Sequence, residues 1–256
     1  MAKIIAIANQ KGGVGKTTTA VNLSAAIAQA GKSVLMVDLD PQGNTTSGFG
    51  RRVGERNSVY DAMMGRSGLR QCVQATDLKK LFLAGSDIRL AGAEVELVSV
   101  KEREFYLKKL LGPAREDYDF IFVDCPPSLS LLTLNALAAA DSVLVPIQCE
   151  YYALEGVTSL MNTVNRVKHT FNPHLEIEGI LLTMLDGRTN LGLQVVDQVK
   201  KHFKKQVFAT TIPRNVRLGE APSHGQPICL YDPRSSGAMA YDALAKEVLA
   251  RNRKKK

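Results

Sequence analysis

The segment at residues 9–19 constrains this chain most, because its glycines and lysines are arranged to surround phosphate at a strand-to-helix turn. It reads NQKGGVGKTTT, follows the apolar run at residues 3–8 and precedes a helical pattern at residues 20–30. Glycines let backbone N–H groups converge on phosphate oxygens, and the N-terminus of the following helix adds partial positive charge. We therefore predict a phosphate-binding loop in a nucleoside-triphosphate switch or hydrolase.

Two lysines of this loop have separate predicted tasks. Lys16 would reach the terminal phosphates, while Thr17 would offer its hydroxyl to Mg²⁺. The usual pattern has glycine at position 10, but this chain has Gln10 followed by a second lysine, Lys11. A cation there can stabilise charge on the transferred phosphoryl group, and hydrolysis would need a dimer if Lys11 reaches a partner's nucleotide. The predicted nucleotide-binding residues of the loop are Lys11, Gly12, Gly13, Val14, Gly15, Lys16, Thr17 and Thr18.

Three aspartates follow apolar, strand-like runs. Asp38 and Asp40 follow residues 34–37, and Asp124 follows residues 120–123. Ligands of open parallel sheets bind at the carboxyl ends of the strands. We assign Asp124 to hold a water on Mg²⁺, Asp40 to orient the attacking water and Asp38 to support the metal's water shell, so that these three and Thr17 form the metal site. The alternative is that any of them caps a helix or a turn.

Strand-like and helical patterns alternate along the chain, which predicts an α/β fold with a doubly wound, mainly parallel sheet flanked by helices. The expected strands lie at residues 4–8, 34–37, 80–84, 120–123, 142–146, 177–184 and 207–211. A length of 256 residues with 45% hydrophobic content suits a single domain, 1–256, with a short, flexible basic tail at 251–256. Residues 48–68, rich in glycine, arginine and serine, are predicted to form an exposed loop or insertion.

Several absences favour a cytoplasmic protein. No basic, apolar and small-residue series at the start predicts a secretory signal. The apolar stretch at residues 129–147 contains polar residues and is short for a membrane span, so it predicts a buried helix that leads into a strand. The cysteines lack paired spacing and indicate a reducing compartment, with Cys125 a small buried filler; they are Cys72, Cys125, Cys149 and Cys229.

Charge points to a polyanionic partner, because 33 Lys and Arg against 25 Asp and Glu give a net charge of +8. Residues 191–205 predict a helix with an apolar stripe and a basic stripe. The clustering predicts a surface that contacts duplex DNA through phosphates, without reading bases. The alternative is a solvated helix face and a solubilising tail. The apolar stripe is Leu191, Val195, Val199 and Phe203, and the DNA candidates are Arg188, Lys200, Lys201, Lys204, Lys205, Arg214, Arg217 and Arg234.

Seven segments together resemble the ParA/Soj family of chromosome- and plasmid-partitioning ATPases, in the deviant Walker-A class that also contains MinD. The segments are KGGVGKTT at 11–18, DLDPQGN at 38–44, DCPPS at 124–128, CEYYALEG at 149–156, LLTMLDGRTNLG at 181–192, IPRNVRLGEAPSHGQPI at 212–228 and YDPRSSGA at 231–238. The resemblance implies a weak, Mg²⁺-dependent ATPase in which Lys11 acts across an ATP-sandwiched dimer. It also implies that Met184, Pro213 and Asn215 line the adenine.

The resemblance further implies partners and location. The ATP-bound homodimer would bind nonspecific double-stranded DNA on the nucleoid and leave it when a ParB-type centromere-binding protein stimulates hydrolysis. Two alternatives remain open. One is a MinD-like membrane switch, although residues 251–256 offer charge without an apolar anchor, so that no stable membrane association is expected. The other is a ParA-like ATPase that positions a different protein cargo.

Overall fold

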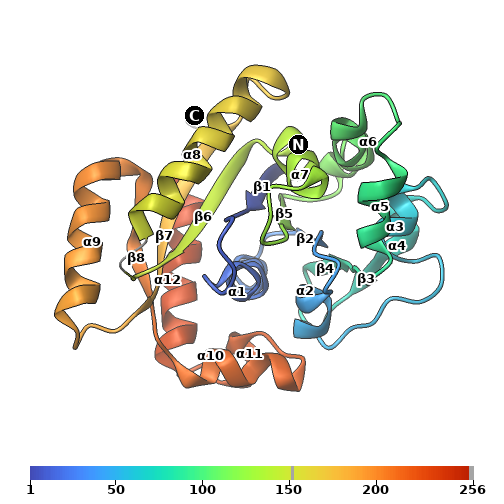
Figure 1. Cartoon of the computed structure of the whole chain (residues 1–256). Helices are drawn as coiled ribbons and strands as arrows, with labels where there is room; N and C mark the ends of the chain where they lie inside the picture. Colours follow the sequence, from blue (N-terminus) through green and yellow to red (C-terminus); the bar gives the residue numbers. More distant parts are fainter. Residues whose placement is uncertain (151–152, 254–256) are drawn as a thin grey trace.

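The computed structural model describes residues 1–150 and 153–253, and its centre is an eight-stranded sheet (Figure 1). The strand order is β3-β4-β2-β5-β1-β6-β7-β8, and every pairing is parallel except that of β3 with β4. This confirms the predicted α/β fold and the seven predicted strands. The strands are β1 (Lys3–Ile7), β2 (Val34–Asp38), β3 (Val73–Ala75), β4 (Leu81–Ala84), β5 (Phe120–Asp124), β6 (Ser142–Gln148), β7 (Glu176–Leu185) and β8 (Val207–Pro213).

Helices cover both faces of the sheet (Figure 1). The longer ones are α1 (Lys16–Gln29), α7 (Leu131–Ala139), α8 (Ala153–Thr170), α9 (Asn190–Phe203) and α12 (Ser236–Arg251). Helices α1 and α12 pack together on one face, while α7, α8 and α9 contribute to the core on the other. The short helices are α2 (Asn44–Gly48), α3 (Val59–Met63), α4 (Leu69–Cys72), α5 (Leu90–Glu96), α6 (Tyr106–Leu111), α10 (Val216–Glu220), α11 (Ile228–Tyr231), η1 (Arg103–Phe105), η2 (Pro113–Glu116), η3 (Lys204–Gln206) and η4 (Ala221–His224).

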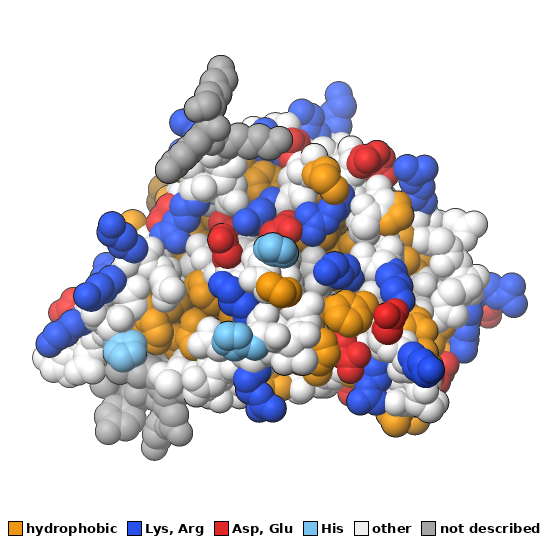
Figure 2. Space-filling model, turned by 90° about the horizontal axis from the view of Figure 1, so that it is seen from above, with side chains coloured by type: hydrophobic (Ala, Val, Ile, Leu, Met, Phe, Trp, Pro, Cys, Tyr) orange, Lys and Arg blue, Asp and Glu red, His pale blue; other side chains and the backbone are white. Residues whose placement is uncertain are grey.

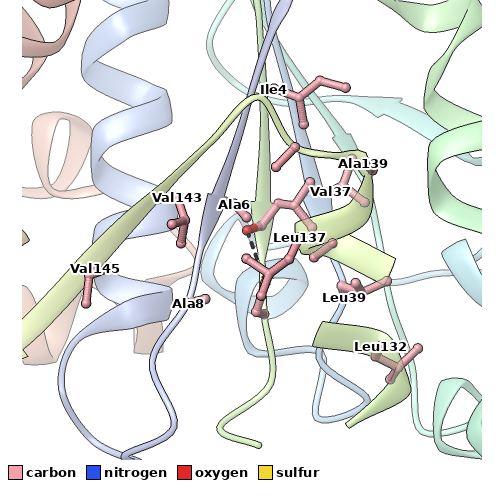
Figure 3. Packing of buried hydrophobic residues seen from close by; sticks show 14 of the residues in the cluster. Ile4, Ala6, Ala8, Val37, Leu39, Leu132, Leu137, Ala139, Val143 and Val145 are labelled. Carbon is pink, nitrogen blue, oxygen red and sulfur yellow. Dashed lines mark hydrogen bonds between the residues drawn. The ribbon is translucent and has the colours of Figure 1, made fainter. Parts of the chain in front are cut away.

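Strand β1 is buried on both of its faces, as expected of a central parallel strand. Ile4 and Ala6 belong to the core beneath α7, whereas Ile5 and Ile7 belong to the core beneath α1. Figure 3 shows Ile4 and Ala6 of β1 among the residues of the same cluster as Leu137 of α7. Because successive side chains of a strand point to opposite faces of the sheet, an uninterrupted apolar run packs into the cores on both faces.

The register of the central strands places the predicted site residues at one edge of the sheet. Strand β5 lies between β1 and β2, and Asp124 is paired in register with Ile7 on one side and with Asp38 on the other. The phosphate-binding loop leaves β1 directly after Ile7. The predicted convergence of this loop with the two aspartates at the carboxyl ends of the strands is therefore confirmed.

Residues 48–68 are only partly the exposed loop that composition predicts. Residues 54–57 are exposed, but Ser58 and all of α3 are buried. The Ser58 hydroxyl accepts a hydrogen bond from the Asp61 N–H, and the Asp61 carboxylate accepts one from the Ser58 N–H, which completes a capping box. The prediction is wrong for residues 58–63 because this short helix is buried along its whole length.

The prediction of a flexible basic tail at residues 251–256 is also wrong for its first residue. Arg251 is the last residue of α12, and its guanidinium donates to the backbone oxygens of Glu178 (2.9 Å) and Val207 (3.2 Å). The same guanidinium lies 4.1 Å from the ring centroid of Phe208. Residues 254–256 of the predicted tail, like residues 151–152 of the CEYYALEG segment, lie outside the described residues.

Two predictions about buried segments are confirmed. Residues 129–147 contain the buried helix α7 followed by the buried strand β6. Cys125 is 1% exposed and is a free thiol. Within residues 1–150 and 153–253, none of the helices combines the length and apolar character that crossing a membrane requires.

Candidate nucleotide-binding site

The phosphate-binding loop makes a turn whose backbone conformation favours glycine. Gly13 and Gly15 have φ angles of 73° and 84°, in the left-handed region that L side chains rarely adopt. The Thr183 hydroxyl on β7 donates to the backbone oxygens of Val14 (2.9 Å) and Ile147 (3.0 Å). The loop is thus fixed to β6 and β7 by a threonine of the LLTMLDGRTNLG segment that was not among the predicted site residues. The eight predicted loop residues, Lys11 to Thr18, all lie between β1 and the first turn of α1.

The two loop lysines occupy different environments. Lys16 is 7% exposed, and its Nζ donates to the backbone oxygen of Lys11 at 3.1 Å. Burial lowers the pKa of Lys16, while the negative charge of Asp124 opposes that shift. The Nζ of Lys11 is more exposed and lies 3.3 Å from Oε2 of Glu150. Exposed pairs of this kind contribute at most about 1 kcal/mol, so Lys11 can exchange Glu150 for another anion at little cost.

Asp124 is the centre of the site. Its Oδ2 accepts hydrogen bonds from the hydroxyls of Thr17 (2.8 Å) and Thr45 (2.7 Å). Its Oδ1 is buried and has no hydrogen-bond partner among the described residues. Mg²⁺ is usually held by one or two carboxylates, water and substrate phosphates, and an orphaned carboxylate oxygen beside a hydroxyl fits that donor set. Within the described residues no group of three or more His, Cys, Asp or Glu side chains is arranged to hold a metal ion, so water and phosphates would complete the shell of a cation here.

The other two aspartates hold the loop between β2 and α2. Oδ2 of Asp38 accepts from the N–H (2.8 Å) and the hydroxyl (2.7 Å) of Thr46, and its Oδ1 accepts from the N–H of Asp40 (3.2 Å). Oδ1 of Asp40 accepts from the N–H of Gln42 at 3.0 Å. Asp38 thus anchors the start of α2. Its place in a metal's water shell, and that of Asp40 beside an attacking water, stay predictions.

A cavity of about 180 Å³ opens beside the loop, and it collects the residues predicted to line adenine. Met184, Pro213 and Asn215 all border it, with Gly15 and Thr18 from the loop. The Asn215 side chain also has a structural task, because its oxygen caps α10 by accepting from the N–H of Leu218 at 3.2 Å. Adenine contact by these residues remains a prediction. Further lining residues that were not predicted to contact adenine are Thr183, Ile212, Leu218 and Tyr241.

Helix α9 is amphipathic as predicted, but it ends earlier. Val195 and Val199 are buried, while Lys200 and Lys201 are exposed. The helix stops at Phe203, and the next residues, Lys204 and Lys205, lie in η3. The prediction of one helical stripe of four lysines is therefore wrong, because Lys204 has a φ of 46° and turns the chain. All four lysines are nevertheless exposed.

Seen from above, Lys and Arg side chains alternate with Asp and Glu over much of the molecule, and several lie along the left edge, the side on which α9 lies in Figure 1 (Figure 2). Of the predicted DNA-contacting arginines, Arg188 lies 2.8 Å from Asp186, and Arg217 lies 2.8 Å from Glu220. The Arg188 guanidinium lowers the pKa of Asp186 to about 2. The other two arginines, Arg214 and Arg234, are exposed and form no ion pair in the described part of the chain.

Comparison with known proteins decides the family. A family model described as an AAA domain matches residues 2–177. The sporulation initiation inhibitor protein Soj of Bacillus subtilis is 58% identical over 98% of this chain and 99% of its own. The chromosome partitioning protein ParA of Myxococcus xanthus is 53% identical over 98% of this chain and 89% of its own. The chain belongs to the ParA/Soj family of chromosome-partitioning ATPases.

A solved structure relates this ParA/Soj ATPase to nucleotide complexes. Cobyrinic acid a,c-diamide synthase from Mycobacterium smegmatis, solved with a bound ATP analogue and magnesium, has a TM-score of 0.85 and 37% identity. The match covers 97% of this chain and 95% of that one. The predicted family and fold are thereby confirmed, and the ATPase class follows from the family.

The buried carboxylates of this ParA/Soj ATPase have perturbed proton affinities. Burial, with a smaller contribution from the charge of Asp38, raises the pKa of Asp124 to about 7, although the Thr45 and Thr17 hydroxyls oppose the shift. Burial also raises the pKa of Asp38 to about 6, against the hydrogen bonds from Thr46. Two carboxyls at one sheet edge therefore hold protons in the folded protein at a pH where exposed carboxyls are ionised.

We expect the free energy of unfolding of the nucleotide-free protein to fall as the pH rises from 5 to 7. In this window folded Asp124 and Asp38 keep protons that the unfolded chain, with an ordinary aspartate pKa of 3.8, has released. The state that binds more protons is favoured at lower pH, by up to about 1.4 kcal/mol per pH unit for each group. Urea unfolding at pH 5, 6 and 7 measures the slope, and Asp124→Asn should flatten it. A free energy of unfolding that increases with pH in the wild type but not in this variant would contradict a raised pKa of Asp124 in the folded protein.

Proposed function

We propose that this ParA/Soj ATPase works as a single P-loop domain that hydrolyses Mg²⁺-bound ATP to ADP and phosphate at a low intrinsic rate. The observation that carries the proposal is the arrangement at Asp124, where two hydroxyls occupy one carboxylate oxygen and the other is buried and unpaired among the described residues. Thr17, at the start of α1, would offer its hydroxyl to the cation.

The chain's own residues would divide the reaction between them. Lys16 would leave the backbone oxygen of Lys11 and donate to the terminal phosphates, while Thr17 would bind Mg²⁺ and Asp124 would hold a water on it. The metal, when bound, would offset negative charge on the phosphates. Asp40 would orient the attacking water from a loop that α2 and Asp38 hold in place. Lys11 would exchange Glu150 for the nucleotide of a second subunit.

Dimerisation would connect the nucleotide to DNA. Two subunits joined by ATP and Lys11 would present their α9 and η3 lysines, with Arg188, Arg214, Arg217 and Arg234, to duplex phosphates. Support comes from the exposure of these cations and from the similarity to chromosome-partitioning proteins. Such contacts read no sequence. A ParB-type centromere-binding protein would stimulate hydrolysis and so release the dimer from the nucleoid.

The test is retention of the protein on nonspecific duplex DNA with ATP, with ADP and without nucleotide, each at two salt concentrations. Retention with ATP alone that weakens at higher salt supports the proposal, since phosphate contacts release counterions. Equal retention with and without nucleotide would show that the basic residues attract DNA by charge alone, without a nucleotide-dependent switch. No retention, together with ATP-dependent flotation on anionic liposomes, would instead favour a MinD-like membrane switch.

A further inference from the structure

Two hydroxyls share one oxygen of Asp124, and they come from different elements. Thr17 belongs to α1 beside the phosphate-binding loop, and Thr45 belongs to α2, which follows the loop that carries Asp40. Thr45 is fully buried, with 0% of its surface exposed. Within the described residues its hydroxyl bonds to Asp124 alone, so its proton has no other acceptor there.

The neighbouring threonine makes the equivalent contact with the other buried acid. Thr46 donates both its N–H and its hydroxyl to Oδ2 of Asp38, and its hydroxyl oxygen accepts from the N–H of Ser86 at 2.9 Å. Consecutive residues of α2 are therefore attached to Asp124 and to Asp38. Because Thr46 fixes α2 to β2 and to the end of β4, Thr45 approaches Asp124 from a rigid support.

We propose that Thr45 is a positioning residue for the Mg²⁺ site, an inference that rests on the proposed ATPase function. Its hydrogen bond fixes the rotation of the Asp124 carboxylate and leaves Oδ1 as the oxygen available to a metal-bound water. Thr17 donates to the same oxygen but must also meet the cation, whereas the Thr45 hydroxyl has Asp124 as its one hydrogen-bond partner in the described residues. Partners that orient a metal-binding group from outside typically change metal affinity 10–100-fold when they are removed.

The test measures Mg²⁺ affinity through nucleotide binding rather than through turnover. A fluorescent, slowly hydrolysed ATP analogue, mant-AMPPNP, is titrated into the wild type, Thr45→Val and Thr45→Ser over a range of Mg²⁺ concentrations and in EDTA. We expect Thr45→Val to raise the Mg²⁺ concentration for half-saturation by about tenfold or more. Its affinity for the analogue in EDTA should stay at the wild-type value, and Thr45→Ser should restore the Mg²⁺ dependence.

Controls separate positioning from folding. Thr133→Val removes another buried hydroxyl, which donates to the backbone oxygen of Ser128 at 2.6 Å, and thermal unfolding compares the stability cost of both variants. If Thr45→Val does not fold, Thr45→Ala against Thr45→Ser isolates the hydroxyl, because both lack the methyl group. An unchanged Mg²⁺ requirement in the variants would overturn the role of Thr45 alone. A wild type that binds the analogue equally well with Mg²⁺ and with EDTA would overturn the Mg²⁺ site of the proposed function as well.

Discussion

The Lys16→Ala variant is expected to bind ATP about a hundredfold more weakly than the wild type and to remain a monomer when ATP is added. The Lys16 ammonium is nearly buried in the phosphate-binding loop, where its one hydrogen-bond partner in the described residues is the backbone oxygen of Lys11. A phosphate would replace that neutral acceptor, and a hydrogen bond between charged groups contributes about 1.5–3 kcal/mol. Binding of mant-ATP measures the affinity, and gel filtration with light scattering measures the mass.

A matched control shows whether the effect comes from the nucleotide site. Lys80→Ala also removes a lysine that donates to a backbone oxygen, that of Gly31 at 2.6 Å, but it does so past the opposite end of α1. We expect Lys80→Ala to dimerise with ATP as the wild type does. If wild type and Lys16→Ala have the same monomeric mass with ATP, the nucleotide-dependent dimer in our proposal is wrong.

The fold could be predicted wherever a segment's own pattern decides its structure. Central strands such as β5 are buried on both faces, so the first four residues of β5 appear as an apolar run that ends at Asp124. Strand β3 has no such run, because Val73–Ala75 is half-exposed at the edge of the sheet and is defined by its antiparallel pairing with β4. Helix α3 was missed for a related reason: its glycine- and arginine-rich surroundings masked the capping residue Ser58.

The same distinction applies to the site. The phosphate-binding loop and Asp124 could be located because each lies next to its own strand in the sequence. Thr45 could not, since its partner Asp124 is 79 positions away and the contact exists only because β2 and β5 are neighbours. Thr183 likewise reaches the loop from 169 positions away. The consecutive threonines after the DPQGN segment were the one available signal, and threonine alone does not specify a partner.

Reversing the charge of Arg188 and Arg217 together is expected to abolish retention on nonspecific DNA while ATP-dependent dimerisation persists. The double variant, Arg188→Glu with Arg217→Glu, lowers the formal net charge of each subunit from +8 to +4. Each arginine forms its ion pairs with surface carboxylates, Asp186 in one case and Glu220 with Asp232 in the other, so phosphates can compete for it. Every lost phosphate contact should also reduce the salt dependence of binding by about 0.9 in the logarithmic slope.

Arg70→Glu is the matched control for this charge reversal, because it repeats the chemistry of Arg188 on a different part of the surface. The Arg70 side chain is 84% exposed and pairs with Asp117 at 3.0 Å, whereas that of Arg188 is 88% exposed and pairs with Asp186 at 2.8 Å. If total charge governed retention, Arg70→Glu would weaken it as much as Arg188→Glu alone. We expect near-wild-type retention by Arg70→Glu, because a contact surface formed by α9 and the loops beside it depends on position. Loss of dimerisation together with DNA retention in the double variant would show instead that these arginines support the subunit interface or the fold.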